Sequence, residues 1–155
     1  MPHGRIGHLV NQRVLNHPVI MVVDNDAGST KVFQHLSNLL GVVVDGTAPF
    51  YYAYANLYVV PVPKSAVKTT TIEDLFDPSL LDRKIVGREF DRTGKAKDGT
   101  KWYGKFEFAT KIIRPERSKI DFVRFEPLLD AFVKVIDDYS LRRVTLAAAA
   151  KAAAA

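Results

Sequence analysis

The feature that most constrains this chain is a short apolar run that ends in two aspartates. Pro18 precedes Val19-Ile20-Met21-Val22-Val23, and Asp24-Asn25-Asp26 follows directly. An unbroken apolar, largely β-branched run of this length is typical of a strand that is covered on both faces of a parallel sheet. The sequence therefore predicts a buried strand over residues 19–23 with carboxylates at its C-terminal end.

The residues after the aspartates predict a helix and further strands. Beyond Gly28-Ser29-Thr30, apolar side chains recur at helical spacing as far as Gly41, which suits a left-handed C-cap. Val42–Val44 and Leu57–Val60 are two further strand candidates. This order of elements predicts an α/β fold with a short, mostly parallel sheet flanked by helices.

The second half of the chain predicts helices separated by a polar loop, and thus a helical C-terminal extension. We expect short helices within residues 69–76 and from Asp77, and a third over residues 105–113. Residues 91–101, rich in Lys, Asp and Gly, predict a solvated hairpin or loop. A stronger helix is expected after Glu126-Pro127. Its predicted apolar face comprises Leu128, Leu129, Phe132, Val135, Ile136 and Tyr139.

Three segments are expected along the chain. Residues 1–17 have little apolar periodicity, and we interpret them as an arm or the remnant of a truncated upstream region. Residues 18–140 are expected to form the folded domain with its extension. Residues 141–155 form a basic and then polyalanine tail, whose residues 147–155 offer no apolar face to bury and play no part in the functional interpretation.

Composition narrows the classes of protein that this chain can belong to. Its formal net charge of +5 attracts polyanions, so nucleic acid is a predicted partner; the alternative is a charge that only aids solubility. The absence of cysteine excludes a disulfide framework, a thiolate zinc site and a cysteine nucleophile. The apolar runs are far shorter than the ~20 residues of a membrane span. The first residues also lack the apolar stretch of a secretory signal, so we expect a cytoplasmic protein without membrane partners.

Asp24 and Asp26 are the strongest candidates for chemistry. Open α/β sheets bind ligands at the carboxyl ends of their strands, and two carboxylates this close are costly without a cation. Mg²⁺ or Mn²⁺ takes such oxygen ligands and can polarise a phosphodiester. The alternative is an Asx-type turn, in which these side chains only bind the local backbone.

Other acidic motifs can be compared with the same segment. A calcium loop of the EF-hand type would need Gly and Glu where Ser29 and His35 stand, so that site is excluded. A haloacid-dehalogenase-like phosphatase also begins with a strand and two aspartates, and Ser29 and Thr30 would supply its nearby hydroxyls. That alternative stays open. The four histidines lack the helical i, i+4 pair of a zinc protease motif.

Four blocks in a fixed order extend the pattern beyond the aspartates. They are PVIMVVDNDAG (18–28), NLYVVPVPK (56–64), IEDLFDPSLL (72–81) and YGKFEFA (103–109). Together they resemble the TOPRIM region at the C-terminus of retron reverse transcriptases. The resemblance implies a TOPRIM-like domain over residues 18–140, related to topoisomerase, primase and overcoming-lysogenisation-defect nucleases. It also implies a toxic effector of anti-phage defence, with a reverse transcriptase domain and its noncoding RNA/DNA hybrid as partners, and it is compatible with an oligomer.

The resemblance also implies roles for particular residues. Asp24 and Asp26 would be metal ligands, and Glu73 and Asp74 would complete a second acidic cluster that also binds the metal. Lys105 would face the scissile phosphate as a charge stabiliser. The catalytic set implied in this way is Asp24, Asp26, Glu73 and Lys105.

Each of these assignments has a simpler rival. Thr70 and Glu73 have capping-box spacing, which would make Glu73 a helix-start residue. Lys105 would then be one solvated cation in a basic stretch. Lys31, Lys101 and Lys111 are weaker candidates for contacts with phosphates.

The sequence departs from the family pattern in one respect. TOPRIM domains place a Glu, commonly followed by Gly, at the end of an earlier strand, whereas the first Glu here is Glu73. Either the chain is a piece of a longer protein or its catalytic set is incomplete. Three functions follow as hypotheses: a metal-dependent phosphodiesterase or nuclease, a non-catalytic nucleic-acid-binding or assembly module, and a phosphatase.

Overall fold

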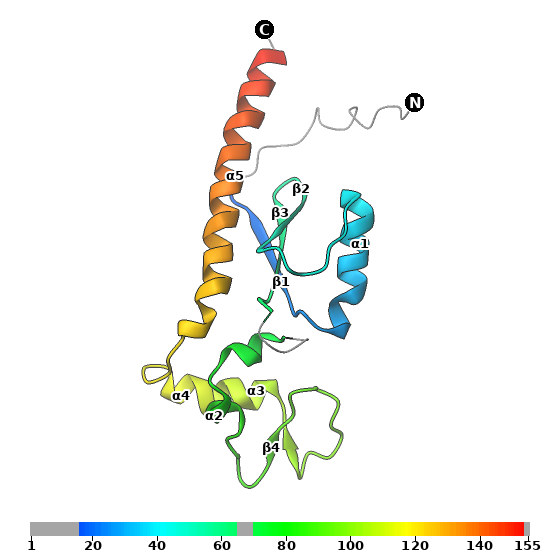
Figure 1. Ribbon diagram of the computed structural model, residues 1–155. Coiled ribbons are helices and arrows are strands. Elements are labelled where there is room, and N and C mark those ends of the chain that lie inside the picture. Colours follow the sequence, from blue (N-terminus) through cyan, green and yellow to red (C-terminus); the bar gives the residue numbers. More distant parts are fainter. Residues whose placement is uncertain (1–15, 65–69, 154–155) are drawn as a thin grey trace.

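The central strand of the molecule is β3 (Leu57–Pro61), which pairs in parallel with β1 (Val19–Val23) and antiparallel with β2 (Tyr51–Tyr54). The computed structural model describes residues 16–64 and 70–153 and shows a mixed α/β fold (Figure 1). The predicted strands over residues 19–23 and 57–60 are present, but β1 is not buried as expected. Within the described residues it is an edge strand, paired only with β3, and Val19, Met21 and Val22 are 52%, 39% and 38% exposed. The three-stranded sheet, in the order β1-β3-β2, is mixed rather than mostly parallel because β2 runs against β3.

The strand predicted at Val42–Val44 is wrong. The 3-10 turn η1 (Ala27–Ser29) leads into α1 (Thr30–Leu40), which ends at Gly41 with φ of 69°, as expected. The next residues form a loop in which Val44 is buried while Val43 is 86% exposed. The Ser37 hydroxyl accepts a hydrogen bond from the Val44 backbone N–H at 2.9 Å, so a helix side chain, rather than a neighbouring strand, satisfies this group.

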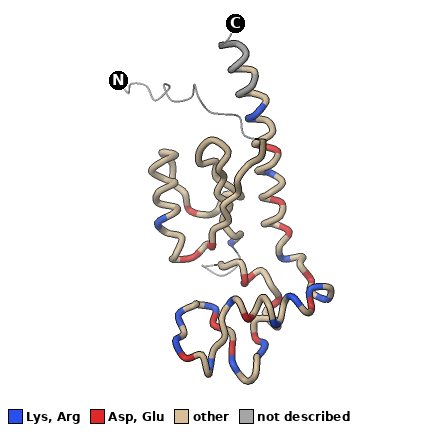
Figure 2. The backbone as a smooth tube through the Cα atoms, turned by 180° about the vertical axis from the view of Figure 1, so that it is seen from behind, with Lys and Arg blue, Asp and Glu red and all other residues tan. Residues whose placement is uncertain are grey.

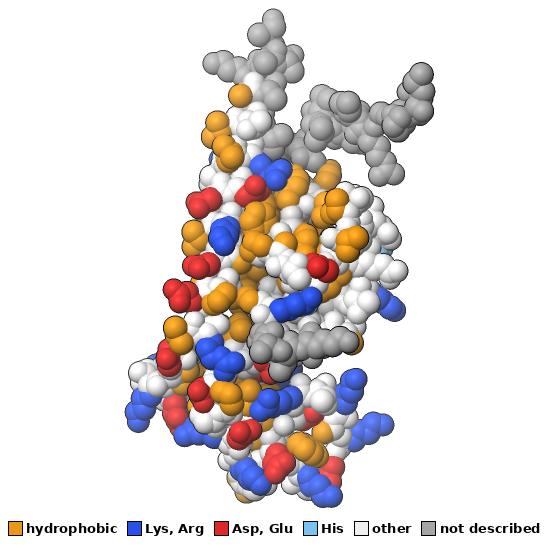
Figure 3. Space-filling model, viewed as in Figure 1, with side chains coloured by type: hydrophobic (Ala, Val, Ile, Leu, Met, Phe, Trp, Pro, Cys, Tyr) orange, Lys and Arg blue, Asp and Glu red, His pale blue; other side chains and the backbone are white. Residues whose placement is uncertain are grey.

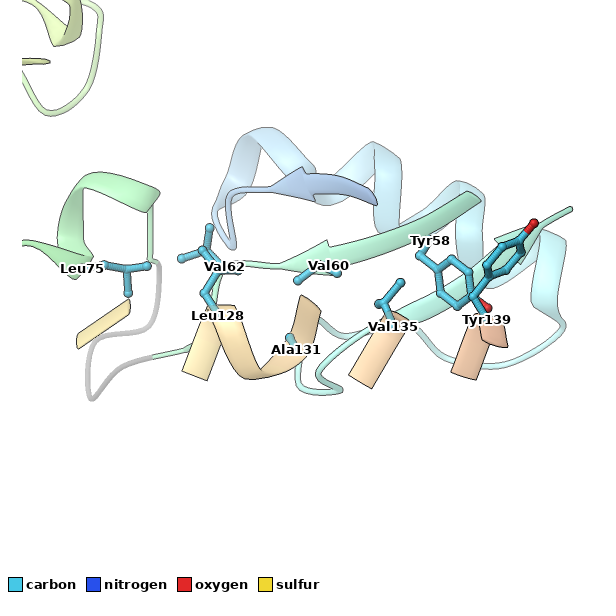
Figure 4. Close-up of a cluster of buried hydrophobic side chains, with 8 residues drawn as sticks. All are labelled: Tyr58, Val60, Val62, Leu75, Leu128, Ala131, Val135 and Tyr139. Carbon is cyan, nitrogen blue, oxygen red and sulfur yellow. The ribbon is translucent and has the colours of Figure 1, made fainter. Parts of the chain in front are cut away.

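Helices cover both faces of β3. Its Tyr58 and Val60 side chains pack against the long helix α5 (Glu126–Ala153), whereas Val59, on the opposite face, packs with residues of α1 and the loop after it. Figure 1 shows α1 and α5 on opposite sides of the sheet, and Figure 4 shows the α5 side of this core. Burial on both faces explains why β3 is an unbroken apolar run.

The buried stripe of α5 is narrower than the sequence indicates. Leu128, Ala131, Val135 and Tyr139 are its buried side chains in this core. They are spaced by three or four residues, which places them in one line along a helix. Leu129 and Ile136, predicted to lie on the same face, are 53% and 51% exposed. The helix therefore packs against the sheet along one line of side chains, and Leu129 and Ile136, beside that line, are exposed to solvent.

The segment between the sheet and α5 forms a second lobe, the lower part of Figure 1. It begins with η2 (Ile72–Leu75) and α2 (Pro78–Leu81), which confirm two predicted short helices. A two-stranded parallel sheet follows, formed by β4 (Glu89–Phe90) and β5 (Trp102–Tyr103), with the predicted loop between them. The predicted extension is thus only partly helical. Leu81, Phe90, Tyr103, Phe108 and Ile112 form the core of this lobe.

The second lobe ends in a run of short helical pieces. They are α3 (Lys105–Glu107), the π-helical turn η3 (Phe108–Ile113), α4 (Arg114–Glu116) and η4 (Val123–Phe125). The helix predicted over residues 105–113 is therefore present, but residues 108–113 are π-helical and α4 continues the run to Glu116. In residues 16–64 and 70–153, none of the helices combines the length and apolar character of a membrane span. Residues 1–15 of the predicted arm and 154–155 of the predicted tail lie outside the described residues.

The two neighbours Val135 and Ile136 provide a matched test of how α5 faces the sheet. We expect Val135→Ala to lower the free energy of unfolding by about 2 to 3 kcal/mol, because it leaves a cavity in the core. Ile136→Ala should cost less than about 1 kcal/mol, although it removes a larger side chain. Urea denaturation of both variants checks this difference, and equal losses would contradict the packing.

Candidate functional site at the end of strand β1

Asn25 fixes the segment that carries both aspartates. Its side chain is buried, and its Nδ2 donates to the backbone oxygens of Gly46 at 2.7 Å and of Val62 at 3.2 Å. Its backbone N–H and C=O pair with those of Thr70 at 2.7 and 3.0 Å. Side chains alternate along extended backbone, so Asp24 and Asp26 lie on the opposite side from Asn25. The amide is inside and both carboxylates are only partly buried.

Asp26 caps the helical segment that follows it. Its Oδ1 accepts hydrogen bonds from the backbone N–H groups of Gly28 at 2.9 Å and Ser29 at 3.2 Å. The Asx-type turn considered from the sequence is therefore present at this residue. The second carboxylate oxygen, Oδ2, accepts no hydrogen bond from the residues that the structure describes, so the cap leaves one oxygen available to a ligand.

Asp24 connects the sheet to the second lobe. Its Oδ1 accepts a hydrogen bond from the backbone N–H of Ile72, the first residue of η2, at 3.0 Å. Its Oδ2 lies 3.9 Å from the Lys105 Nζ. Asp24 therefore contacts two separate segments of the second lobe from the end of β1.

The capping box of η2 differs from the one proposed from the sequence. It joins Thr71 and Asp74, not Thr70 and Glu73: the Asp74 Oδ2 accepts from the Thr71 backbone N–H at 2.8 Å and from its hydroxyl at 2.9 Å. The box lies one residue later because Thr70 is occupied in its backbone pairing with Asn25. Asp74 is thus occupied as a cap, while Glu73 is not needed for capping.

Glu73 instead binds Lys105. The Lys105 Nζ donates to the Glu73 Oε2 at 2.8 Å. Partial burial acts to lower the pKa of Lys105, but the Glu73 hydrogen bond and the negative charges of Glu73, Asp24 and Asp26 outweigh it, and the pKa lies above its ordinary value. Lys105 therefore stays cationic at neutral pH and suits charge stabilisation rather than proton abstraction.

The other lysines predicted from the sequence lie outside this cluster. Lys31 is an exposed residue of α1. Lys101 is 3.8 Å from Asp98, and Lys111 pairs with Glu107 at 2.6 Å. Hydrogen bonds from Arg88 and Lys111 lower the pKa of Glu107 to about 2. Lys101 and Lys111 share the second lobe with Lys105, but neither contacts its acidic partners.

The hydroxyls considered for a phosphatase are not directed to the aspartates. The Thr30 hydroxyl donates to the Ala27 backbone oxygen at 2.9 Å, and Ser29 is buried. Among the described residues, no hydrogen bond joins either hydroxyl to the Asp24 or Asp26 carboxylate. The local geometry gives the phosphatase interpretation no support.

The donor set limits the kind of metal ion that this site would hold. In residues 16–64 and 70–153, no group of three His, Cys, Asp or Glu side chains is arranged to bind a metal. Asp24 and Asp26 still offer two hard oxygen donors on one side of the chain. Mg²⁺ is commonly held by one or two carboxylates, with water and substrate phosphate as its other ligands. The two aspartates fit an ion of that kind.

Comparison with known proteins adds no assignment to this geometry. No protein-family model matches the chain, and no solved structure shows a significant match to it. The residues at the end of β1 are therefore the basis on which a function is assigned. Sequence reasoning missed one of them, the buried Asn25, although the alternation of side chains along a strand places the middle residue of Asp-Asn-Asp on the inner side.

Gly46 tests how closely the Asn25 amide is enclosed. A Cβ at this buried glycine, whose φ is 75°, would lie 2.6 Å from the Asn25 Oδ1. We expect Gly46→Ala to lower the free energy of unfolding by about 2 to 4 kcal/mol, through backbone strain and the clash. Gly87 is the control because its φ is 78° and no atom lies within 4 Å of the added Cβ. Gly87→Ala should show the strain alone, about 1 to 2 kcal/mol; equal losses in urea denaturation would contradict the enclosure of Asn25.

Proposed function

We propose that this chain is a TOPRIM-like phosphodiesterase domain that cleaves nucleic acid with a divalent metal ion. The observation that carries the proposal is the convergence of Asp24, Glu73 and Lys105, from three separate parts of the sequence, beside Asp26 at the end of β1. An ion pair that only stabilises the fold needs two partners, one of each charge. The lysine here faces two acidic residues from two different elements, at the sheet edge where open α/β folds bind ligands.

Each residue has a distinct role in this proposal. Asp24 and Asp26 would hold Mg²⁺ or Mn²⁺, which supplies Lewis-acid polarisation of the phosphodiester and an activated water. Lys105 stabilises the negative charge that develops on the phosphoryl oxygens. Glu73 positions the Lys105 ammonium through its 2.8 Å hydrogen bond. Asp74 acts on this site only indirectly, as the cap of η2.

The charge distribution supports a polymeric substrate. Residues 82–119 contain 12 Lys and Arg against 6 Asp and Glu, and the whole second lobe, residues 72–125, contains 13 against 10, a net charge of +3. Figures 2 and 3 show Lys and Arg gathered on the second lobe, which carries Lys105. A basic surface next to the cleavage site attracts a polyanion more strongly than a small phosphate ester. With the sequence resemblance, this extends the proposal to a toxic effector that works with a retron reverse transcriptase and its RNA/DNA hybrid.

A second function has its own supporting observation. Asp26 already serves as a helix cap, and the described residues contain no third acidic side chain placed to complete a metal site. A non-catalytic nucleic-acid-binding module would retain the basic second lobe and bind polymers in a salt-dependent manner without cleaving them.

Asp26→Asn separates the two functions. Asn caps a helix as well as Asp does, so the variant should fold like the parent chain while it loses a metal-binding carboxylate. We expect metal-dependent cleavage of labelled single-stranded RNA, transfer RNA or DNA to fall by roughly 10² to 10³-fold, the scale on which single electrostatic contributions are lost. Cleavage by the parent chain should also stop when a chelator is added.

Asp77→Asn is the matched control. Asp77 caps α2 through its Oδ1, which accepts from the Ser79 backbone N–H at 2.8 Å, and the same substitution there should leave cleavage unchanged. Cleavage that persists in Asp26→Asn, or that needs no metal, would overturn the proposed chemistry. Salt-sensitive binding without cleavage by the parent chain would identify the non-catalytic module.

A further inference from the structure

A cavity of about 680 Å³ opens on the second lobe, between α2 and the β4–β5 sheet. Leu81, Phe90 and Trp102 supply its apolar lining, and Lys84, Glu89 and Arg92 are among its polar lining residues. Its volume falls within the range of about 300 to 1,000 Å³ that is typical of small-ligand sites. None of the roles proposed for the site at β1 uses this cavity.

Trp102 is the only tryptophan of the chain. It is 38% exposed, whereas its neighbour Tyr103 is buried in the core of the lobe, as expected from alternation along β5. The indole therefore lines the cavity while remaining accessible to solvent. Planar bases stack on aromatic side chains held in this way, and the stacking tolerates any sequence.

The loop that forms one wall of the cavity is held in place by a buried carboxylate. The Asp91 Oδ1 accepts from the Thr93 backbone N–H at 2.9 Å and from its hydroxyl at 2.7 Å, and the Oδ2 accepts from the Ala96 backbone N–H at 2.8 Å. The hydroxyl of Thr93 and these backbone groups keep the pKa of Asp91 below its ordinary value. Thr93 and Ala96 both line the cavity, so this wall is formed before a ligand arrives.

Charges of both signs surround the cavity. Lys95 and Lys97, on the same loop, form no ion pair with any acidic residue that the structure describes. Arg92 lies 3.3 Å from Asp82 and 4.0 Å from Asp74, which belongs to η2. Carboxylates accept hydrogen bonds from exocyclic amino groups of bases, and lysines bind backbone phosphates. The set of groups suits a nucleotide within a strand.

We infer that this cavity binds one base of a single-stranded nucleic acid, stacked on Trp102, with the adjacent backbone along Lys95 and Lys97. The inference rests on the proposed function, in which the bound strand is the substrate. Trp102 lies three residues before Lys105, so their Cα atoms are at most about 11 Å apart. A strand held in the cavity would thus lie close to the Asp24 and Lys105 cluster. An unpaired strand is required because a base within a duplex does not expose its face.

The single tryptophan allows a direct test. DNA and RNA strands of ten nucleotides and matched sequence are titrated into the full chain. A chelator is present so that no cleavage occurs. Trp102 fluorescence and the anisotropy of a labelled strand are measured. We expect saturable quenching at the same concentrations that raise the anisotropy. The DNA and RNA arms show which strand binds more tightly. A strand that binds without changing the fluorescence, or the absence of binding to either strand, would overturn the inference.

Three variants make the test independent of folding defects. Trp102→Leu should weaken strand binding by about 5- to 100-fold, whereas Trp102→Phe, which keeps an aromatic face, should lose much less. The double change Lys95→Gln and Lys97→Gln should reduce the slope of log affinity against log salt by about 1.4, the value for two phosphates of a single strand. Unaltered affinity in Trp102→Leu would contradict the cavity as the binding site.

The outcomes also separate this inference from the proposed function. Cleavage of strands by a parent chain whose Trp102 fluorescence does not respond would overturn the cavity and leave the phosphodiesterase intact. Quenching of Trp102 by strands without any metal-dependent cleavage would support the cavity and overturn the phosphodiesterase.

Discussion

The buried amide of Asn25 is the interaction on which the arrangement of the site depends. It contacts the backbone of three segments: its side chain binds the loop at Gly46 and the chain leaving β3 at Val62, and its own backbone pairs with Thr70. A buried amide without hydrogen-bond partners would destabilise the fold, so the Asn25 side chain needs these backbone groups close to it. Their consequence is that the flanking aspartates lie on the other side of the chain, and that η2 begins next to Asp24.

The site is formed where the two lobes meet. Asp24 and Asp26 follow a strand of the sheet, whereas Glu73 and Lys105 belong to the second lobe. The backbone N–H of Ile72 and the ammonium of Lys105 both reach the Asp24 carboxylate, so the contacts that join the lobes are also those that assemble the acidic cluster. Because local opening has a lower free energy than global unfolding, the site is expected to be present only while the second lobe is docked.

The sequence predicted the elements whose patterns are local. The strand over residues 19–23, the helix closed by Gly41 and the loop over residues 91–101 needed only apolar periodicity and cap residues. The strand proposed at Val42–Val44 was wrong because β-branched composition does not determine whether a neighbouring strand is within reach. The capping box was misplaced by one residue, since the pairing of Thr70 with Asn25 is a contact between distant segments that local spacing does not contain.

The convergence of Glu73 and Lys105 was expected only through resemblance, because no local pattern places a lysine of the second lobe beside a strand end. Their charges explain why the cluster is stable as it stands. The Glu73 side chain is only 13% exposed, so its negative charge would be unfavourable without a partner. The Lys105 side chain, which is 44% exposed, supplies the compensating positive charge. The same ammonium offsets part of the charge of Asp24. A divalent ion bound there would therefore meet a partly neutralised site, which favours binding together with an anionic phosphate over binding alone.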